Sequence, residues 1–209
     1  MFRKLRIKIY FALAPVLKFF SLIAWKSYKS KNKTIKLVVG AGGTHFGGWF
    51  STDIATLDLT KESDFKLYFS DRMIDFVLAE HVFEHISDSN LELIISNLFK
   101  YSNKKARIRI AVPDGYHTDP TYIDYVKPGG SGAGAHDHRQ LFTYKSLGDW
   151  FEKYGFEAHA VEYWDENGVF HEGYKDDDYG YVSRSFVNDD RNAGGKPVYT
   201  SLVMDFIKK

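Results

Sequence analysis

Apolar and polar positions along the chain predict a series of short buried strands. Compact apolar runs cover residues 35–40, 75–79 and 106–114, and a shorter run covers residues 49–54. Runs of four to eight apolar residues without regular alternation are typical of parallel strands that are covered on both faces. We therefore expect these four segments to form the centre of a sheet.

Two further segments have the spacing of amphipathic helices. In residues 89–101 the apolar side chains recur three or four positions apart, and Ser89 with Glu92 has the form of a capping box. Residues 143–155 predict a second helix, which Gly155 would end as a C-terminal glycine does. Because strands alternate with helices, we expect a mostly parallel α/β sheet wound on both faces.

The last third of the chain predicts two more strands, at residues 156–164 and 198–209. A long polar and aromatic excursion lies between them. Two late strands joined in this way predict an antiparallel pair at one end of the sheet.

The N-terminal segment differs from the rest of the chain. An apolar stretch lies between basic residues there, but Pro15 and Lys18 interrupt it. A spanning helix needs about 20 mostly apolar residues, so we expect a basic amphipathic helix and linker over residues 1–33 and a domain over 34–209. Residues 1–28 suit peripheral contact with an anionic membrane. The alternative is a helix that packs on the domain or on a partner.

Composition narrows the class of protein. The 209 residues carry a net charge of +1, which gives no general electrostatic reason to expect nucleic acid as a partner. The chain has no cysteine, so disulfides, thiolate metal ligands and a thiol nucleophile are excluded. The absence of cysteine also fits a reducing compartment. We expect a cytoplasmic protein, peripheral at the inner face of the membrane if its first helix binds lipid.

A glycine turn, Gly40-Ala41-Gly42, follows the first predicted strand. In open α/β sheets ligands bind at the carboxyl ends of the strands, and small residues there let the backbone approach a ligand closely. The dinucleotide pattern G-x-G-x-x-G fails because His45 stands at its third glycine. Asp53, at the end of the next strand, could accept the two hydroxyls of a ribose. The two features together predict a nucleoside site, and an ordinary turn is the alternative.

Residues 81–85 read H-V-F-E-H, the H-x-x-E-H spacing of inverted zincin peptidases. As a zinc site, His81 and His85 would lie one helical turn apart, with Glu84 as the base. The motif directly follows a buried strand, however, at the ligand edge of the sheet. We therefore favour a helix start beside a cofactor cleft, in which Glu80 and His81 contact the ligand, and we expect no metal site. A plain helix start with hydrogen-bonded histidines is the third interpretation.

Four segments, taken in order, resemble class I S-adenosylmethionine-dependent methyltransferases. They read K-L-V-V-G-A-G-G, G-W-F-S-T-D-I, D-F-V-L-A-E-H-V-F-E-H-I and R-I-R-I-A-V-P-D-G. The chain is similar to a small bacterial group of these enzymes with the patterns A-E-H-x-x-E-H and R-I-x-x-P-D. The later H-D-H-R-Q loop and the helix that follows it also resemble that group.

This resemblance implies a Rossmann-like methyltransferase fold, in which a mostly parallel seven-stranded sheet has an antiparallel C-terminal strand and helices on both faces. It also implies S-adenosylmethionine as the methyl donor. The positions that the resemblance assigns to the donor are Gly40, Ala41 and Gly42 (methionine part), Asp53 (ribose), Asp58 (adenine edge), and Glu80 and His81 (methyl end).

Methyl transfer from a sulfonium is an in-line displacement, for which the protein mainly positions the two reactants. A hydroxyl acceptor would need a general base, and histidine suits that role near neutral pH. The candidate bases are His81, Asp114, His136 and His138.

The acceptor is expected to be a small molecule or a sugar of a surface polysaccharide, a pathway with which the resembled group is often associated. Arg184, Asp189 and Arg191 are candidates for capping the acceptor site. A zinc-dependent hydrolase that uses residues 81–85 and a non-catalytic binding module of the same fold are the alternatives.

Overall fold

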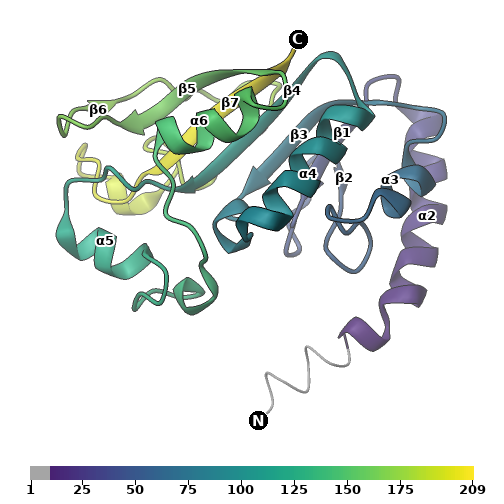
Figure 1. Cartoon of the computed structure of the whole chain (residues 1–209), viewed down its shortest axis with the longest axis horizontal. Helices are drawn as coiled ribbons and strands as arrows, with labels where there is room; N and C mark the ends of the chain where they lie inside the picture. The colour runs from purple at the N-terminus through teal and green to yellow at the C-terminus, as the bar shows by residue number, and fades with distance from the viewer. Residues whose placement is uncertain (1–9) are drawn as a thin grey trace.

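The computed structural model describes residues 10–209. They contain one seven-stranded sheet, whose strands lie in the order β2-β1-β3-β4-β7-β5-β6 (Figure 1). The strands are β1 Lys36–Val39, β2 Phe50–Ser51, β3 Ile74–Glu80, β4 Ser102–Pro113, β5 Phe156–Trp164, β6 Phe170–His171 and β7 Ser201–Lys208. All six predicted strands are therefore present, although β2 is much shorter than the apolar run at residues 49–54.

Strand directions confirm the predicted sheet. β1 pairs in parallel with β2 and β3, and β3 pairs in parallel with β4. β7 is antiparallel to both of its neighbours, β4 and β5, so β5 runs in the direction of the first four strands. The fold is thus a mostly parallel sheet with an antiparallel C-terminal strand, as in Rossmann-like methyltransferases.

The helices are α2 Ala14–Lys31, α3 Glu62–Tyr68, α4 Asp88–Tyr101, α5 Pro120–Val126 and α6 Tyr144–Glu152. The predicted capping box of α4 is wrong: Ser87 is its N-cap residue, and no side chain caps the helix. A capping box does exist at α6, between Thr143 and Ser146. Gly155 has a φ of +90° just beyond α6, as a C-terminal glycine requires.

The two faces of the sheet are covered differently. On one face α3, α4 and α6 pack against alternate strand residues such as Val77 and Ile108. On the other face Tyr174 and Val182, from the excursion between β6 and β7, pack against Leu78. We expected helices on both faces, whereas in the described part of the chain this second face is covered mainly by irregular backbone. A buried Arg109, which pairs with Asp205 of β7, anchors that backbone through an ion pair to Asp177 and a hydrogen bond to the Gly180 carbonyl.

Helix α2 joins the domain through its C-terminal half. Trp25 is buried against Phe50 and Tyr68, and its indole N–H donates to the Tyr68 carbonyl at 2.8 Å. The expected polar linker is in fact helical as far as Lys31. The boundary between residues 33 and 34 stays a prediction. Residues 1–9, which hold several of the basic residues of the predicted helix, lie outside the described residues. Among residues 10–209, no helix is long and apolar enough to cross a membrane.

Candidate functional site

The tips of β1 and β2 meet at the carboxyl edge of the sheet. The Ala41 N–H donates to the Thr52 carbonyl at 3.0 Å, and the Gly42 N–H donates to Asp53 Oδ2 at 3.1 Å. The Asp53 carboxylate therefore lies directly against the glycine turn. No helix lies between β1 and β2, which is why the two tips stay so close together.

The glycines of the turn are required by backbone geometry. Gly40 has a φ of +60°, and a Cβ placed on it would lie 2.5 Å from Val82 Cγ2. Gly42 has a φ of +56°, but a Cβ there would meet no atom closer than the Gly40 carbonyl oxygen at 4.0 Å. The left-handed region strongly favours glycine. The space beside Gly42 is therefore open to a ligand, whereas Gly40 packs tightly against Val82 of the H-V-F-E-H motif.

A first cavity, of about 540 Å³, opens on the β2 side of this turn. Gly40, Asp53 and Asp58 line it together with the segment that enters α4. Asp58 Oδ1 accepts hydrogen bonds from the backbone N–H and hydroxyl of Thr60, and its Oδ2 lies 2.9 Å from Lys61 Nζ. Partial burial raises the pKa of Asp58, but these hydrogen bonds and Lys61 outweigh it and leave the pKa below its usual value. The first cavity is therefore lined by two acids, of which Asp58 already has protein partners.

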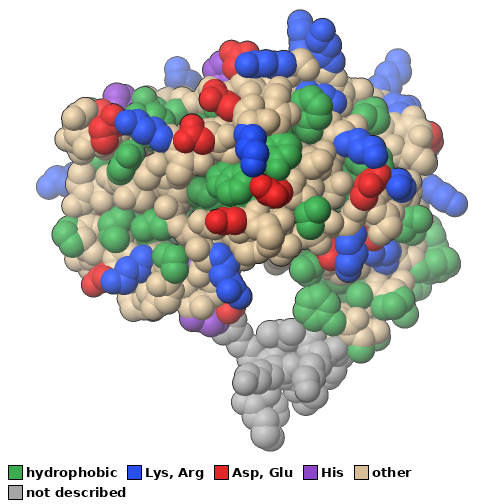
Figure 2. Space-filling view, in the orientation of Figure 1, with side chains coloured by type: hydrophobic (Ala, Val, Ile, Leu, Met, Phe, Trp, Pro, Cys, Tyr) green, Lys and Arg blue, Asp and Glu red, His purple; other side chains and the backbone are tan. Residues whose placement is uncertain are grey.

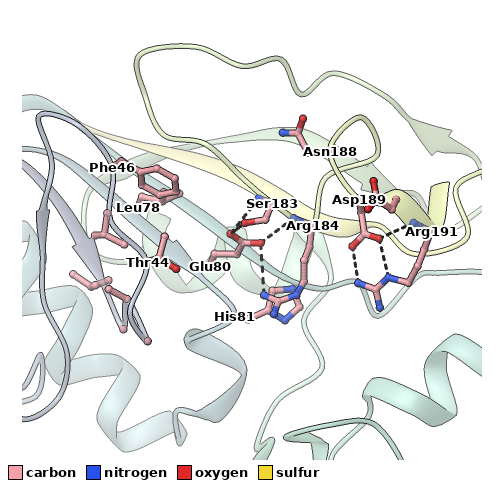
Figure 3. Close-up of a pocket in the computed structure, with 16 residues that line it drawn as sticks. Thr44, Phe46, Leu78, Glu80, His81, Ser183, Arg184, Asn188, Asp189 and Arg191 are labelled. Carbon is pink, nitrogen blue, oxygen red and sulfur yellow. Dashed lines mark hydrogen bonds and ion pairs between the residues drawn. The ribbon is translucent and has the colours of Figure 1, made fainter. Parts of the chain in front are cut away.

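A second cavity, of about 680 Å³, lies on the other side of the glycine turn (Figure 3). Gly40 to Gly42, Thr44 and Phe46 form one wall, and Ser183 with residues 188–191 forms the opposite wall. Gly40 and His81 line both the first and the second cavity. The two cavities therefore adjoin at Gly40 and His81.

Glu80 holds the far wall of the second cavity in place. Its carboxylate accepts hydrogen bonds from the Ser183 N–H and hydroxyl and from the Arg184 N–H, at 2.9 to 3.2 Å (Figure 3). The Arg184 guanidinium lies 3.6 Å from the same carboxylate. We expected Glu80 to contact the ligand directly, whereas its oxygens here bind the loop that faces the ligand space.

The backbone of His81 is strained, and both nitrogens of its ring have protein partners. Its φ is +54°, an uncommon value for a residue other than glycine. Its Nδ1 lies 3.0 Å from Glu84 Oε1, and its Nε2 lies 3.1 Å from Ser201 Oγ. Burial raises the pKa of Glu84, but the His81 contact outweighs it, so the carboxyl has a lowered pKa. Ser201 is fully buried, so this serine orients the imidazole and has no access to a substrate.

The inverted-zincin geometry is not formed. Residues 83–85 make a single 3-10 turn rather than an α-helix, and both ring nitrogens of His81 already have protein partners. His81 and His85 therefore do not face a common ion as they would on one face of an α-helix.

A third cavity, of about 210 Å³, lies beyond His81. Glu84, His85 and His138 line it, and His81 and Arg184 reach it as well. His138 Nδ1 lies 2.6 Å from the Val126 carbonyl oxygen, and the ring packs edge-on against His85. His81 is thus common to all three cavities.

The comparison with family models agrees with this geometry. A family model described as a methyltransferase domain matches residues 35–161, well over half of the chain. The chain belongs to the methyltransferase-domain family. The predicted resemblance to class I S-adenosylmethionine-dependent methyltransferases is thereby confirmed. No curated protein matches the chain by sequence.

Three solved structures are similar to this chain at low sequence identity. A SAM-dependent methyltransferase from Archaeoglobus fulgidus is 15% identical, with 92% of this chain and 94% of that chain covered and a TM-score of 0.45. A possible histamine N-methyltransferase from Thermotoga maritima is 13% identical, with 98% and 95% covered and a TM-score of 0.49. Magnesium protoporphyrin IX methyltransferase from Synechocystis PCC 6803, solved with bound SAH, is 10% identical, with 97% and 87% covered and a TM-score of 0.43.

Two of the predicted bases of this methyltransferase lie away from the three cavities. Asp114 is fully buried; its carboxylate accepts hydrogen bonds from the Tyr116 and Trp164 N–H groups, and burial raises its pKa to about 6. His136 is half exposed and pairs with Asp137 at 3.1 Å. The structure therefore leaves His81 and His138 as the predicted histidines that face ligand space.

Some residues that line the second cavity were expected from the sequence and others were not. Arg184, Asp189 and Arg191, suggested as caps of an acceptor site, do line the second cavity. The lining residues that no sequence motif indicated are Thr44, Phe46, Ser183 and Asn188. Of these four residues, only Ser183 could have been found from the sequence. It stands next to Arg184 in a polar segment of the excursion, and such a segment can bind an acid at the edge of the sheet.

Proposed function

We propose that this methyltransferase transfers the methyl group of S-adenosylmethionine to a hydroxyl of a small molecule or of a sugar. The donor would lie across Gly40 and His81, with its nucleoside in the first cavity and its methionine part toward the second. The observation that carries the proposal is the contact between the Gly42 N–H and the Asp53 carboxylate. Through this contact the Asp53 carboxylate, which we propose binds the ribose hydroxyls, lies beside the backbone of the glycine turn, near the point where the two cavities adjoin.

The acceptor side is supported by the polar wall of the second cavity. Asn188, Asp189 and Arg191 line it, and Arg191 pairs with Asp189 through two hydrogen bonds of 2.5 and 2.8 Å. Amide, carboxylate and guanidinium groups suit a hydroxyl-rich acceptor such as a sugar. His138 is the candidate base, since its Nδ1–H donates to the Val126 carbonyl and Nε2 keeps its lone pair.

Calorimetry with S-adenosylhomocysteine tests the donor site. We expect the dissociation constant to rise at least tenfold in Asp53→Ala, because the ribose hydroxyls lose their acceptor. Asp71→Ala is the matched control, since this exposed acid pairs with Lys29 far from the turn. Equal affinities of wild type and Asp53→Ala would contradict the proposal. Donor binding without turnover on free and lipid-linked sugars would instead favour a non-catalytic module.

The start of α2 supports a further proposal, that the protein contacts membranes peripherally. Its apolar side chains are exposed and gather on one side of the molecule (Figure 2). Within α2 they are Val16, Leu17, Phe19, Phe20 and Ile23, and exposed Phe11 and Leu13 lie just before the helix. Apolar side chains beside basic residues suit the surface of an anionic membrane.

Substitution at the surface tests this contact better than truncation, because removing residues 1–28 would also remove the buried Trp25. We expect a Phe19→Ser, Phe20→Ser double variant to lose flotation with vesicles of phosphatidylcholine and phosphatidylglycerol. Leu93→Ser, at an exposed position of α4, is the control. Flotation that is equal in all three proteins, or absent in wild type, would refute membrane contact through α2.

A further inference from the structure

Glu84 is buried beside a cavity, and its Oε2 has no hydrogen-bond partner within the described protein. The side chain is 1% exposed, and neither carboxylate oxygen has a hydrogen bond of acceptable geometry within the described protein. Its Oε1 lies 3.0 Å from His81 Nδ1. Burying a charged carboxylate is costly unless a cation or hydrogen bonds compensate. Glu84 therefore has unused capacity to bind a cation.

Two histidines are brought to this carboxylate from different parts of the chain. Glu84, His85 and His138 each offer one ligand atom, and these atoms all lie within 4.8 Å of one another. An ion bound at about 2.0 to 2.1 Å from each would draw them closer together. Two imidazoles and one carboxylate are a common ligand set for divalent transition metals that keep an open coordination position.

The backbone fixes the position of the third ligand. The N–H groups of Arg139 and Gln140 both donate to the Glu84 carbonyl, at 2.7 and 3.0 Å. The loop that carries His138 is therefore attached directly to the turn that carries Glu84 and His85. Because α4, β4 and α5 lie between this turn and this loop in the sequence, the cluster does not arise from neighbours along the chain.

The His138 ring is oriented as a metal-binding histidine is. Its Nδ1 lies 2.6 Å from the Val126 carbonyl oxygen, which can only accept, so Nδ1 carries the proton. Nε2 is then left with a lone pair. Metal-ligating histidines commonly donate their other ring N–H to a carbonyl or carboxylate in this way.

Arg184 is the cation that could replace a metal ion here. It lines the same cavity, but its side chain is 44% exposed and lies 3.6 Å from Glu80. No ion pair joins it to Glu84 within the described residues. The cavity of about 210 Å³ next to the cluster leaves room for water or a ligand group to complete the coordination.

We propose that Glu84, His85 and His138 bind one divalent transition-metal ion, with an open coordination position toward the third cavity. This site differs from the H-x-x-E-H zinc site considered for the sequence, because His81 is replaced by His138 from a distant loop. His81 separates the ion from the proposed donor position. An acceptor hydroxyl bound to the ion would be a stronger acid, and this effect would replace the base role of His138, because its Nε2 lone pair then holds the ion. That consequence rests on the proposed function, whereas metal binding does not.

Metal titration of the purified full chain tests the site. After chelation and dialysis, we expect calorimetry to show one Zn²⁺ per chain, and Co²⁺ to give the visible absorption bands of a low-coordinate site. Glu84→Gln keeps the shape of the side chain, and His138→Ala changes a loop residue. Each should weaken Zn²⁺ binding at least tenfold, while His136→Ala, in the same loop but outside the cavity, should leave it unchanged.

Thermal melts of metal-free Glu84→Gln and His138→Ala show whether each variant is folded. One folded variant of the two is enough to decide the test. Absence of stoichiometric Zn²⁺ and Co²⁺ binding by wild type would overturn the proposal. So would an equal loss of affinity in His136→Ala and His138→Ala. S-adenosylhomocysteine binding by the metal-free wild type tests the donor site separately, so either proposal can fail without the other.

Discussion

The carboxyl ends of the strands in the two halves of the sheet, β1 to β3 and β4 with β5, lie in different surroundings. After β1, β2 and β3 the chain leaves open space, and Asp53 and Asp58 line a cavity. At the ends of β4 and β5, Asp114 and Glu162 are fully buried and accept backbone N–H groups. Acids of the same chemical type therefore line an open cavity at one end and are buried against protein groups at the other.

The pKa values follow this difference. Hydrogen bonds from Thr60 and Lys61 outweigh burial and lower the pKa of Asp58. Burial raises the pKa of Asp114 to about 6 and that of Glu162 to about 7. A pKa perturbed by burial is often taken as a sign of catalysis. Here the acids with raised pKa values lie outside the three cavities. Burial is the largest cause for both, and the charges of Glu172 and Asp114 add to the shift at Glu162.

The largest effect on stability is expected at Arg109, in the second half of the sheet. Its buried guanidinium binds Asp205 and Asp177, so Arg109→Ala leaves a buried carboxylate poorly compensated. Breaking a buried ion pair in this way costs about 3–5 kcal/mol. Chemical denaturation measures this loss. Arg107→Ala is the matched control on the same strand, because that side chain is partly exposed and should cost about 1 kcal/mol or less.

The affinity of the same Arg109→Ala variant for the donor product shows whether the second half of the sheet influences binding at the first half. At a temperature where Arg109→Ala is folded, we expect S-adenosylhomocysteine to bind within about threefold of wild type. A tenfold loss would show that the second half of the sheet also supports the donor.

Glu162 should make stability depend on pH. Its pKa is raised from 4.5 to about 7, so the folded state holds a proton that the unfolded state releases. Stability therefore falls as pH rises from 4.5 to about 7 and is flat above that range. At pH 8 Glu162→Gln should be more stable than wild type by up to roughly 3 kcal/mol, at about 1.36 kcal/mol per pKa unit.

Denaturation between pH 6.5 and 8 isolates this group from Asp114, which acts below about pH 6, and from His117, whose pKa burial lowers from 6.5. Glu157→Gln, an exposed position on the same strand, should change stability by less than about 0.5 kcal/mol. A pH slope that persists unchanged in Glu162→Gln would contradict the assignment.

In the first half of the sheet, substitution of glycine should affect binding. Gly40→Ala and Gly43→Ala both place a side chain at positive φ, which costs about 1–2 kcal/mol. Only the Gly40 side chain would meet Val82, since nothing lies within 4 Å of a Cβ on Gly43. We expect the affinity for S-adenosylhomocysteine to fall at least tenfold in Gly40→Ala and less than threefold in Gly43→Ala. Similar losses in both would mean that strain alone matters.

Sequence patterns predicted the first half of the sheet better than the second. The glycine turn and Asp53 follow adjacent strands that are also consecutive in the sequence, so their proximity follows from local strand order. Burial of whole strands also leaves a clear apolar run. These features made the sheet, and the proximity of Asp53 to the glycine turn, predictable.

The roles of Glu80 and Asp114 depend on distant partners. Glu80 binds Ser183 and Arg184, which lie beyond β6 in the excursion, and Asp114 binds the Trp164 N–H. Whether an acid at a strand end faces a ligand or a loop is decided by tertiary packing. Strand and motif patterns indicate that such an acid is at the edge of the sheet, but not which loop covers it.

The smallest effect is expected at His136, and it separates two histidines that the sequence made equivalent. Both lie in the H-D-H loop, but His136 is half exposed and His138 lines the third cavity. His136→Ala should leave the free energy of unfolding within about 0.5 kcal/mol and methyl transfer unchanged. His138→Ala should lower methyl transfer at least tenfold while S-adenosylhomocysteine affinity stays within threefold, as radiolabelled transfer and calorimetry would measure. Equal activity of the two variants would mean that the acceptor lies in the second cavity only, and that the third cavity has no part in the reaction.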